Sequence, residues 1–448
     1  MSGFPISENS PIEHTGPLPD TADVVIIGGG IIGVTTALFL ARKGVRAVLL
    51  EKGRVAGEQS SRNWGWIRQQ GRDLAELPIT REANRHWLSL QQQTDCDIGL
   101  KRCGLTYLAK DEEQLAGYED WLSQARETGV DSRILPSGET AELVQGMSRP
   151  FVGALHTPSD MVAEPWFATP ALARLAAHEG AVIIENCAVR MLDIEAGRVA
   201  GVITESGRIR ASEVVMAGGS WSTLFLRRHG IVLPQLSVRA TVVATNALPE
   251  VHKGGAVGDR LAFRRRQDGG YTLAAAGFHE VMIGFDAFRF APKFLPHIRN
   301  DPFDRRYLPF SPKHYPDAWG VSRRWSADAV SPFEKMRILN PAPNRTKVEE
   351  ARQRFEALFP ELGRVSVASA WAGMIDTTPD VVPVVDRAEA LPGLSICTGM
   401  CGHGFGIGPG FGRIMADMVT GGEIGHDLSR FRLGRFADGS KLVLGPDV

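Results

Sequence analysis

The chain has 448 residues, of which 43% are hydrophobic and 23% are charged, and its formal net charge is -1. This length accommodates more than one folding unit, and the balanced charge argues against nucleic acid as a partner. The scattered cysteines form neither a disulfide framework nor a pattern of metal ligands, which favours reduced thiols in a cytoplasmic protein; they are Cys96, Cys103, Cys187, Cys397 and Cys401.

The first twenty residues are rich in proline, serine and glutamate and predict a flexible arm, not a secretory signal. The strongest apolar stretch, residues 24–40, is interrupted by three consecutive glycines and by threonines. It is too broken for a membrane span, so we expect a soluble protein.

A strand, a turn, a helix and a second strand follow the arm. Residues 22–27 are a β-branched apolar run typical of a strand buried on both faces, and residues 45–50 are a second one. Between them, residues 31–43 have helical character and end at Gly44, a favourable residue after a helix. The order predicts one right-handed βαβ unit.

The turn of this unit, Gly28-Gly29-Gly30-Ile31-Ile32-Gly33, fits the pattern G-x-G-x-x-G. The first glycine allows a tight turn, the second admits a pyrophosphate, and the third lets helix and strand pack closely. Glu51 ends the second strand, where its carboxylate can accept hydrogen bonds from ribose hydroxyls and repel a 2′-phosphate. The motif predicts a bound dinucleotide other than NADP, but it does not separate FAD from NAD.

Later elements alternate between helices and strands. Helices are expected over residues 82–94, 112–128, 170–179, 348–359 and 410–420, and strands over 181–185, 189–194, 199–204, 213–217, 238–245, 260–266, 271–275 and 394–398. Residues 290–316 are rich in proline and aromatic residues and poorly periodic, so we expect a loop that could hold short helices.

A second glycine-rich segment, residues 398–412, lies between a predicted strand and a predicted helix near the end of the chain. An NAD dehydrogenase does not need a second glycine-lined cradle there. Backbone N–H groups and a helix N-terminus would instead stabilise the negative charge of a reduced flavin. This segment favours FAD.

Four segments together resemble the D-amino-acid oxidase superfamily of FAD-dependent oxidoreductases, in its sarcosine oxidase and glycine oxidase-like branch. They are residues 28–33 with Glu51, residues 60–65, residues 214–222, and residues 378–380 followed by 402–405. Their order spans residues 23–431, nearly the whole chain.

The resemblance implies a Rossmann-like FAD-binding domain of the α/β class and an α+β substrate domain built on a mainly antiparallel sheet. The FAD-binding domain would comprise residues 21–80, 150–235 and 365–432, and the substrate domain residues 81–149 and 236–364. Residues 1–20 would form the arm and 433–448 a C-terminal tail. The residues implied at the cofactor are Gly28, Gly30, Ile31, Ile32, Gly33, Glu51, Lys52, Ser60, Ser61, Arg62, Asn63, Trp64, Gly65, Val189, Ala217, Gly218, Trp221, Gly402, His403, Gly404, Phe405 and Gly406.

The chain departs from the family at three points. Some relatives attach the flavin to a cysteine shortly before the Thr-Pro-Asp segment, but residues 371–376 contain none, so we expect non-covalent FAD. Gly406 replaces the lysine of sarcosine oxidase-like members. An arginine that some amino-acid oxidases carry before Thr378 is missing, which weakens the case for a simple α-amino acid.

Six residues are candidates for the catalytic pocket. The segment 64–72 holds two tryptophans, two arginines and two glutamines in addition to glycines, which either line a substrate pocket or pack between domains. His403 could orient the substrate, tune the flavin or be structural. The candidates are Trp66, Arg68, Gln69, Trp371, Met374 and His403, although core packing is the commoner role for a tryptophan and a methionine.

The implied reaction oxidises the C–N bond of an amine or amino acid, possibly N-substituted, by hydride transfer to flavin N5. The imine product is hydrolysed, and oxygen or another acceptor reoxidises the flavin. Three alternatives stay open: a flavin-bearing subunit of a larger dehydrogenase complex, an FAD-dependent hydroxy-acid dehydrogenase, and an NAD-linked dehydrogenase. The sequence also leaves open whether the protein forms an oligomer.

Overall fold

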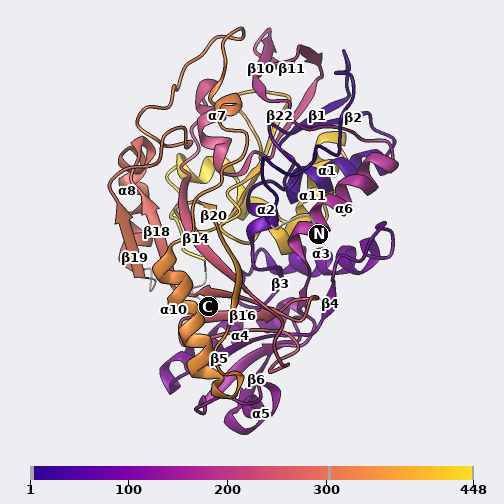
Figure 1. The fold of residues 1–448 in the computed structure, drawn as a ribbon. Helices are drawn as coiled ribbons and strands as arrows, with labels where there is room; N and C mark the ends of the chain where they lie inside the picture. The colour runs from indigo at the N-terminus through magenta and orange to yellow at the C-terminus, as the bar shows by residue number, and fades with distance from the viewer. Residues whose placement is uncertain (1–4, 301–303, 446–448) are drawn as a thin grey trace.

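The computed structural model describes residues 5–300 and 304–445, and it contains two large sheets (Figure 1). A six-stranded sheet has the order β21-β22-β13-β1-β2-β9. Five of its strands run parallel and β21 pairs antiparallel with β22 at one edge. The strands are β1 (Val24–Ile27), β2 (Ala47–Leu50), β9 (Val182–Ile184), β13 (Glu213–Met216), β21 (Val384–Arg387) and β22 (Leu394–Thr398).

Alternate residues of β1 enter two different cores, because successive side chains of a strand point to opposite faces. Ile26 packs into the core formed with helices α1 (Ile31–Arg42), α6 (Pro165–His178) and α11 (Gly404–Thr420), and α3 (Leu77–Leu90) covers α11. Val25 packs on the opposite side, where α7 (Ser222–Arg228) and a small sheet lie. That small sheet contains β10 (Val189–Glu195), β11 (Arg198–Thr204) and β12 (Arg208–Arg210). The predicted βαβ unit and Rossmann-like domain are confirmed.

A ten-stranded sheet occupies the lower part of Figure 1. Its pairs are antiparallel except β5–β15 and β18–β19, so the expected antiparallel second sheet is also confirmed. Its strands are β5 (Leu105–Ala109), β6 (Arg133–Pro136), β7 (Gly153–Thr157), β14 (Leu236–Thr245), β15 (Gly255–Gly258), β16 (Leu261–Arg265), β17 (Tyr271–Ala275), β18 (Phe278–Met282), β19 (Asp304–Leu308) and β20 (Val367–Thr377).

Helices cover both faces of this sheet. Phe355 of α10 (Arg345–Leu358) stacks against Phe263, whereas Tyr118 of α4 (Glu112–Ala125) stacks against Tyr107 on the other face. Short elements complete the described chain: α2 (Gln59–Arg62), α5 (Ser137–Leu143), α9 (Pro332–Lys335), and a three-stranded sheet of β3 (Trp66–Ile67), β4 (Lys101–Arg102) and β8 (Met161–Val162).

The expectation of a loop over residues 290–316 was wrong for its first part. A sixteen-residue helix, α8 (Phe285–Asn300), runs there despite Pro292 and Pro296 inside it, and β19 follows. The two prolines are exposed, whereas Phe290 and Phe294, also four residues apart, are buried. Helical burial of these phenylalanines therefore outweighs the helix-breaking tendency of proline.

Helix α11 begins at Gly404, six residues earlier than expected. Two of its glycines, Gly408 and Gly412, lie against α1, and a Cβ added at Gly408 would come within 2.6 Å of Ile31 Cγ1. The Thr35 hydroxyl also donates a hydrogen bond to the Gly408 carbonyl oxygen, at 3.0 Å. Glycine is disfavoured inside a helix, but here it permits the close packing that places both helices beside the sheet.

The predicted domain boundaries stay a prediction. Strands β7 and β20 lie in ranges assigned to the FAD-binding domain, yet both belong to the ten-stranded sheet. The chain therefore crosses between the two sheets several times. Part of the predicted arm is held in place, since Arg54 Nε donates to the carbonyl oxygen of Ser10. Residues 1–4 and 446–448 of the arm and the tail lie outside the described residues.

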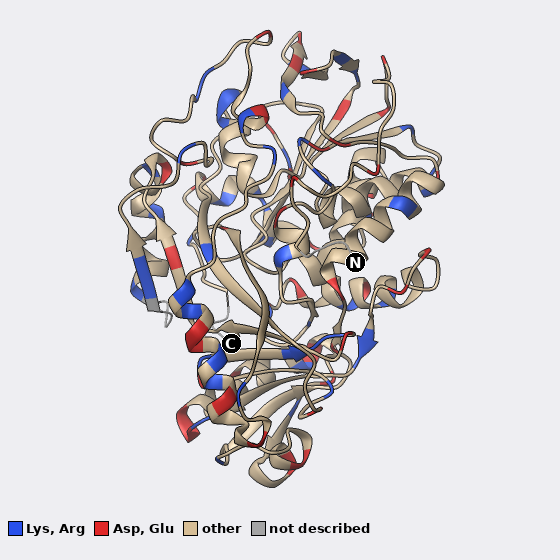
Figure 2. Ribbon diagram, in the orientation of Figure 1, with Lys and Arg blue, Asp and Glu red and all other residues tan. Residues whose placement is uncertain are grey.

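Within residues 5–300 and 304–445, no helix is both long enough and apolar enough to cross a bilayer. Figure 2 shows that basic and acidic residues are interspersed over both parts of the molecule, for example along α10.

Gly33 should tolerate no side chain. A Cβ there would collide with the Gly28 carbonyl oxygen and lie 3.3 Å from Ile26 Cγ2, so Gly33→Ala must push α1 away from β1. We expect the free energy of unfolding to fall by about 1–3 kcal/mol or more. The matched control is Gly138→Ala in α5, where no atom lies within 4 Å of the new Cβ. Chemical denaturation measures both; equal stabilities of the two variants would contradict this packing.

Candidate active site

A first cavity, here called the strand-end cavity, lies where four parallel strands of the six-stranded sheet end. The residue after each of β1, β2 and β13 lines it, as does the last residue of β22: Gly28, Glu51, Ala217 and Thr398. Ligands of open α/β folds bind at this edge, because strands end there and helices begin with free N–H groups.

The first glycine turn has the geometry that its motif predicts. Gly28 has φ +111°, a conformation that favours glycine, and a Cβ added to it would lie 2.5 Å from the Ala217 carbonyl oxygen. A Cβ on Gly30 would lie 3.2 Å from Ser60 Oγ. The backbone at the start of α1 is therefore open to the cavity only because these side chains are absent.

Two polar side chains lie beside this turn. Glu51 accepts hydrogen bonds from the backbone N–H groups of Gly29 and Gly53, both at 2.7 Å. Burial raises the pKa of Glu51 to about 7. The Ser60 hydroxyl accepts a hydrogen bond from the Ile31 N–H at the N-terminus of α1, at 2.9 Å. These groups present hydrogen-bonding oxygens at the positions expected for a ribose and a pyrophosphate.

The second glycine segment lies on the same cavity. Gly402 (φ +83°), Gly404 and Phe405 line it together with Gly30, although Gly30 and Gly404 are far apart in sequence. Asp376 anchors the residues just before this loop: its Oδ2 accepts hydrogen bonds from the N–H groups of Gly399 (2.9 Å) and Met400 (3.3 Å). The expectation that both cradles border one space is met by the geometry.

A second, larger cavity of about 760 Å³, here called the arginine cavity, lies against the ten-stranded sheet and is also lined by residues within 59–72 and 401–405. Gln59, Asn63, Gly402 and Phe405 line both cavities, so the two spaces meet at the second glycine segment. Two tryptophans form part of its wall: the rings of Trp64 and Trp66 meet edge to face at a centroid distance of 5.1 Å. Other lining residues include Arg68, Arg72, Tyr107, Tyr118, Arg239, Ile375 and His403.

Arg68 and Arg72 supply positive charge that the protein does not pair directly. Arg68 donates to the Gln70 carbonyl oxygen at 3.3 Å and lies over the Tyr107 ring, while Arg72 Nη1 is buried without a hydrogen-bond partner. Among the described residues, no carboxylate oxygen lies within ion-pair distance of either guanidinium. Burial lowers the pKa of Arg72 to about 10 and that of Arg68 well below its usual value.

Three further titratable groups border these arginines. Burial lowers the pKa of His403 to about 4, and its Nδ1 lies 3.3–3.4 Å from the carboxylate of Glu76. Burial acts to raise the pKa of Glu76, but His403 and the two arginines outweigh it and the pKa is lowered. Burial raises the pKa of Asp160 to about 7 even though Gln69 N–H donates to it at 2.8 Å. Below about pH 7 the cluster therefore carries net positive charge.

The structure places three of the six pocket candidates on the arginine cavity and three away from its lining. Trp66, Arg68 and His403 line it. Gln69 is 3% exposed and bonds to Asp160 and Ser159, Trp371 donates to the Arg62 carbonyl oxygen at 3.0 Å, and Met374 lies in the core beside α7. The last three side chains satisfy packing and hydrogen bonding inside the protein.

The predicted cofactor residues also divide. Those on the strand-end cavity are Gly28, Gly30, Ile31, Ile32, Glu51, Lys52, Ser60, Asn63, Val189, Ala217, Gly218, Trp221, Gly402, Gly404 and Phe405. Arg62, Trp64 and His403 line the arginine cavity. Gly33, Ser61, Gly65 and Gly406 line neither cavity; a Cβ on Gly406 would lie 3.1 Å from Ile67 Cα.

Sequence reasoning missed Arg72, Asp376 and Glu58. Arg72 stood in the segment 64–72, but nothing in its spacing separated it from a surface arginine. Asp376 and Glu58 form hydrogen bonds to residues remote in sequence, which local patterns do not reveal. Glu58 accepts one from Trp221 Nε1 at 3.0 Å, and Asp376 accepts one from Gly399 N–H. No cluster of three or more His, Cys, Asp or Glu side chains suited to a metal occurs in the described part of the chain.

Comparison with known proteins defines the class. The family model described as DAO, FAD dependent oxidoreductase, matches residues 23–418. The chain belongs to this family of FAD dependent oxidoreductases. It is 31% identical to the solved L-amino acid deaminase from Proteus myxofaciens, with a TM-score of 0.90 over 96% of this chain and 97% of that one.

Curated relatives carry related names. Mitochondrial sarcosine dehydrogenase of Mus musculus is 27% identical over 94% of this chain, but the chain spans only 42% of that protein. Glycine oxidase of Geobacillus kaustophilus is 27% identical over 92% of this chain and 97% of its own length. The chain thus spans less than half of some of its relatives and nearly all of others.

The residues present fit FAD. Two glycine-lined turns from opposite ends of the chain face one cavity, a carboxylate lies at the end of β2, and the space continues from the strand ends into the arginine cavity. An elongated dinucleotide with a ring system at one end needs this arrangement. A plain NAD site would not require the second cradle.

Glu51→Gln should weaken FAD binding. The amide NH₂ of glutamine would face a backbone N–H that the carboxylate now accepts from, either Gly29 or Gly53, and one acceptor for the ribose would be lost. We expect the dissociation constant of FAD to rise about tenfold or more, by titration of apoprotein. Asp20→Asn, an exposed change at the end of the N-terminal arm, is the control. Equal affinities for wild type and Glu51→Gln would contradict this role.

Proposed function

We propose that the protein uses non-covalently bound FAD to oxidise the C–N bond of an amino acid or N-substituted amino acid, and that Arg68 and Arg72 receive the substrate carboxylate. The observation that carries the proposal is the pair of directly uncompensated guanidiniums in a cavity that adjoins the second glycine cradle. Two buried positive charges are costly unless an anion completes the site. An anionic substrate would supply it.

The cofactor would be held by backbone groups more than by side chains. N–H groups at the start of α1 would face the pyrophosphate, Glu51 the ribose, and the loop of Gly402 and Gly404 the flavin end. FAD, when bound, accepts the hydride from the carbon next to nitrogen. The absence of a cysteine in residues 371–376 supports non-covalent binding.

The chain's own groups would bind and orient the substrate. The carboxylate would lie against Arg68 and Arg72, and the faces of Trp64 and Trp66 would exclude water from the carbon chain. If His403 Nδ1–H donates to Glu76, its Nε2 is left as an acceptor for the amine N–H. Because the pKa of His403 is about 4, this imidazole stays neutral at physiological pH.

The bond changes balance without a strong base. The substrate amine binds neutral, its α-carbon loses a hydride, and the resulting iminium loses a proton to become an imine. Water then adds to the imine, which gives a carbonyl compound and ammonia or an amine. The arginines hold the carboxylate through these steps, so positioning is the main contribution of this site.

Anaerobic reduction of the FAD-loaded protein tests the proposal. A panel of amino acids of both configurations, N-methylated amino acids, simple amines and hydroxy acids should bleach the flavin only when both a carboxylate and an amine are present, because the arginines and the amine contacts act together. Simple amines should reduce it at least about a hundredfold more slowly. Stopped-flow absorbance measures the rates.

Two outcomes would contradict the proposal. Bleaching by hydroxy acids at the same rate would indicate C–O oxidation, and no bleaching by any compound would favour a subunit that relays electrons within a complex. Admission of air after reduction then tells oxygen from another acceptor. Acid denaturation should release all of the yellow colour into the supernatant; colour that stays on the polypeptide would refute non-covalent attachment.

Carboxylate binding should weaken as the pH rises through about 7. Burial raises the pKa of Asp160 to about 7, so its carboxyl is neutral below that pH and negative above it, beside Arg68. We expect the affinity for anthranilate, whose aromatic amine stays neutral, to fall by up to about tenfold between about pH 6 and about pH 8. Flavin difference spectra report it. In Asp160→Asn the affinity for anthranilate should not change with pH over this range. An equal decline in that variant would show that a group other than Asp160 causes the pH dependence.

A further inference from the structure

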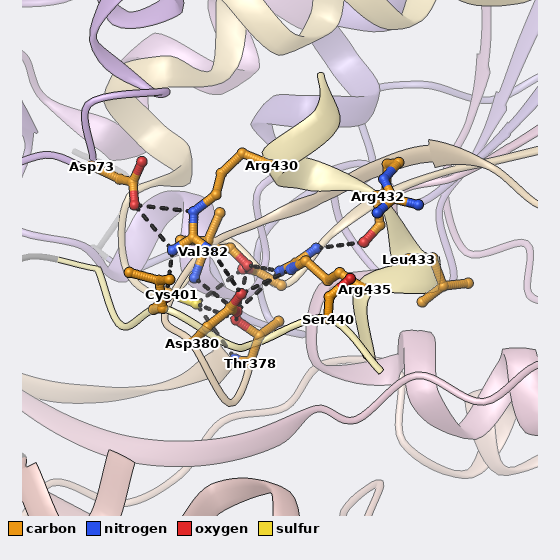
Figure 3. Close-up of polar contacts among 12 residues, drawn as sticks. Asp73, Thr378, Asp380, Val382, Cys401, Arg430, Arg432, Leu433, Arg435 and Ser440 are labelled. Atoms are coloured by element: carbon orange, nitrogen blue, oxygen red, sulfur yellow. Dashed lines mark hydrogen bonds and ion pairs between the residues drawn. The ribbon is translucent and has the colours of Figure 1, made fainter. Parts of the chain in front are cut away.

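Arg430, near the C-terminus, contacts two loops that each adjoin residues of the arginine cavity (Figure 3). Its guanidinium donates to Asp73 Oδ2 from Nε (3.3 Å) and Nη2 (3.2 Å), and to Asp380 Oδ2 from Nη1 (3.3 Å). Asp73 and Asp380 are about 300 residues apart in sequence and belong to different loops. Arg430 is therefore a direct bridge between those loops.

Asp380 lies behind the second glycine cradle. It is fully buried, and Arg435 also donates to it at 2.8 and 3.0 Å. Thr378 Oγ1 donates to Asp380 at 3.2 Å and lies 3.4 Å from Cys401 Sγ, and Cys401 directly precedes Gly402 on the cavity. One end of the bridge thus lies on a carboxylate that contacts, through Thr378, the residue preceding the flavin-side loop.

Asp73 lies behind the two pocket arginines. It directly follows Arg72, its Oδ1 accepts the Ala75 N–H at 2.9 Å, and its carbonyl oxygen accepts the Glu76 N–H at 2.9 Å. The turn over residues 71–76 therefore places Arg72 and the partner of His403, and its outer end is tied to Arg430. The other end of the bridge sets the position of the anion-binding wall.

We propose that Arg430 is a positioning residue that fixes the distance between the anion-binding wall and the flavin-side loop. The planar guanidinium can donate in several directions at once, which a lysine ammonium on a flexible stem does not reproduce. The consequence for substrate binding rests on the proposed function. The bridge itself rests only on the contacts of Arg430 with Asp73 and Asp380.

Hydrogen exchange of the FAD-loaded protein tests the bridge. Arg430→Gln and Arg430→Lys should both speed amide exchange in peptides covering residues 69–76 by about fivefold or more, because the turn loses its outer anchor. The matched control is Arg432→Gln: Arg432 is two residues away, is half exposed, and within residues 5–300 and 304–445 its side chain forms an ion pair with Asp438 alone, at 3.1 Å. Unchanged exchange in both Arg430 variants would overturn the bridge.

Anthranilate binding tests its consequence. In Arg430→Lys, which retains the charge, the dissociation constant from flavin difference spectra should rise about fivefold or more, and in turnover KM should rise more than kcat falls. Asp73→Asn should show the same rise, and the double variant Asp73→Asn/Arg430→Gln no further rise. If the Arg430 variants have an altered melting temperature but bind anthranilate within twofold of the wild-type affinity, Arg430 has a purely structural role and the positioning proposal is overturned. If wild type itself does not bind anthranilate, the proposed anion site fails, whereas the exchange data still decide the bridge.

Discussion

Close approach of one backbone to another is the constraint on which the site depends. At the ends of β1 and β13 the turn at Gly28 lies so near Ala217 that no side chain fits, and Gly33 is as crowded against Gly28. Glycines of α11 pack in the same way against α1. At these turns no side chain separates the backbone from the cavity, so the turn at Gly28 and the start of α1 lie directly on it.

Electrostatics then separates the two cavities by function. The strand-end cavity is lined by the backbone of the two glycine turns and by three carboxylate residues, Glu51, Glu58 and Asp376. The arginine cavity instead offers Arg68 and Arg72 with only indirect compensation. Glu76 and Asp160 keep these charges tolerable without pairing them. The segment that directly follows α2 carries both arginines, so residues that line the two cavities lie within a few positions of one another.

Local sequence signals were sufficient for elements whose burial is regular. The runs at residues 24–27 and 47–50 and the glycine turn between them predicted the βαβ unit, and Glu51 was placed by its distance from that turn. A loop was predicted where α8 lies because Pro292 and Pro296 argued against a helix, although Phe290 and Phe294 have helical spacing. Proline counts against a helix in any local reading, whereas burial of two aromatic rings is a tertiary effect.

The pocket was harder to predict for a related reason. Trp66, Arg68 and Gln69 are neighbours in sequence, yet Gln69 points to Asp160 and only the other two line the cavity. Trp371 and Met374 were plausible because of their nearness to the flavin segment. Met374 alternates with the lining residues Gly373 and Ile375 and so enters the core, whereas Trp371 packs against Trp166. The Asp73–Arg430–Asp380 bridge joins residues remote in sequence, so no local pattern could reveal it.

The most direct test of the central claim is an experimental structure of the protein with FAD and anthranilate. The account predicts FAD extended from Glu51 past Gly30 to the loop at Gly402, with the anthranilate carboxylate within hydrogen-bond distance of Arg68 or Arg72. FAD bound away from the strand-end cavity, or a carboxylate that contacts neither arginine, would contradict it.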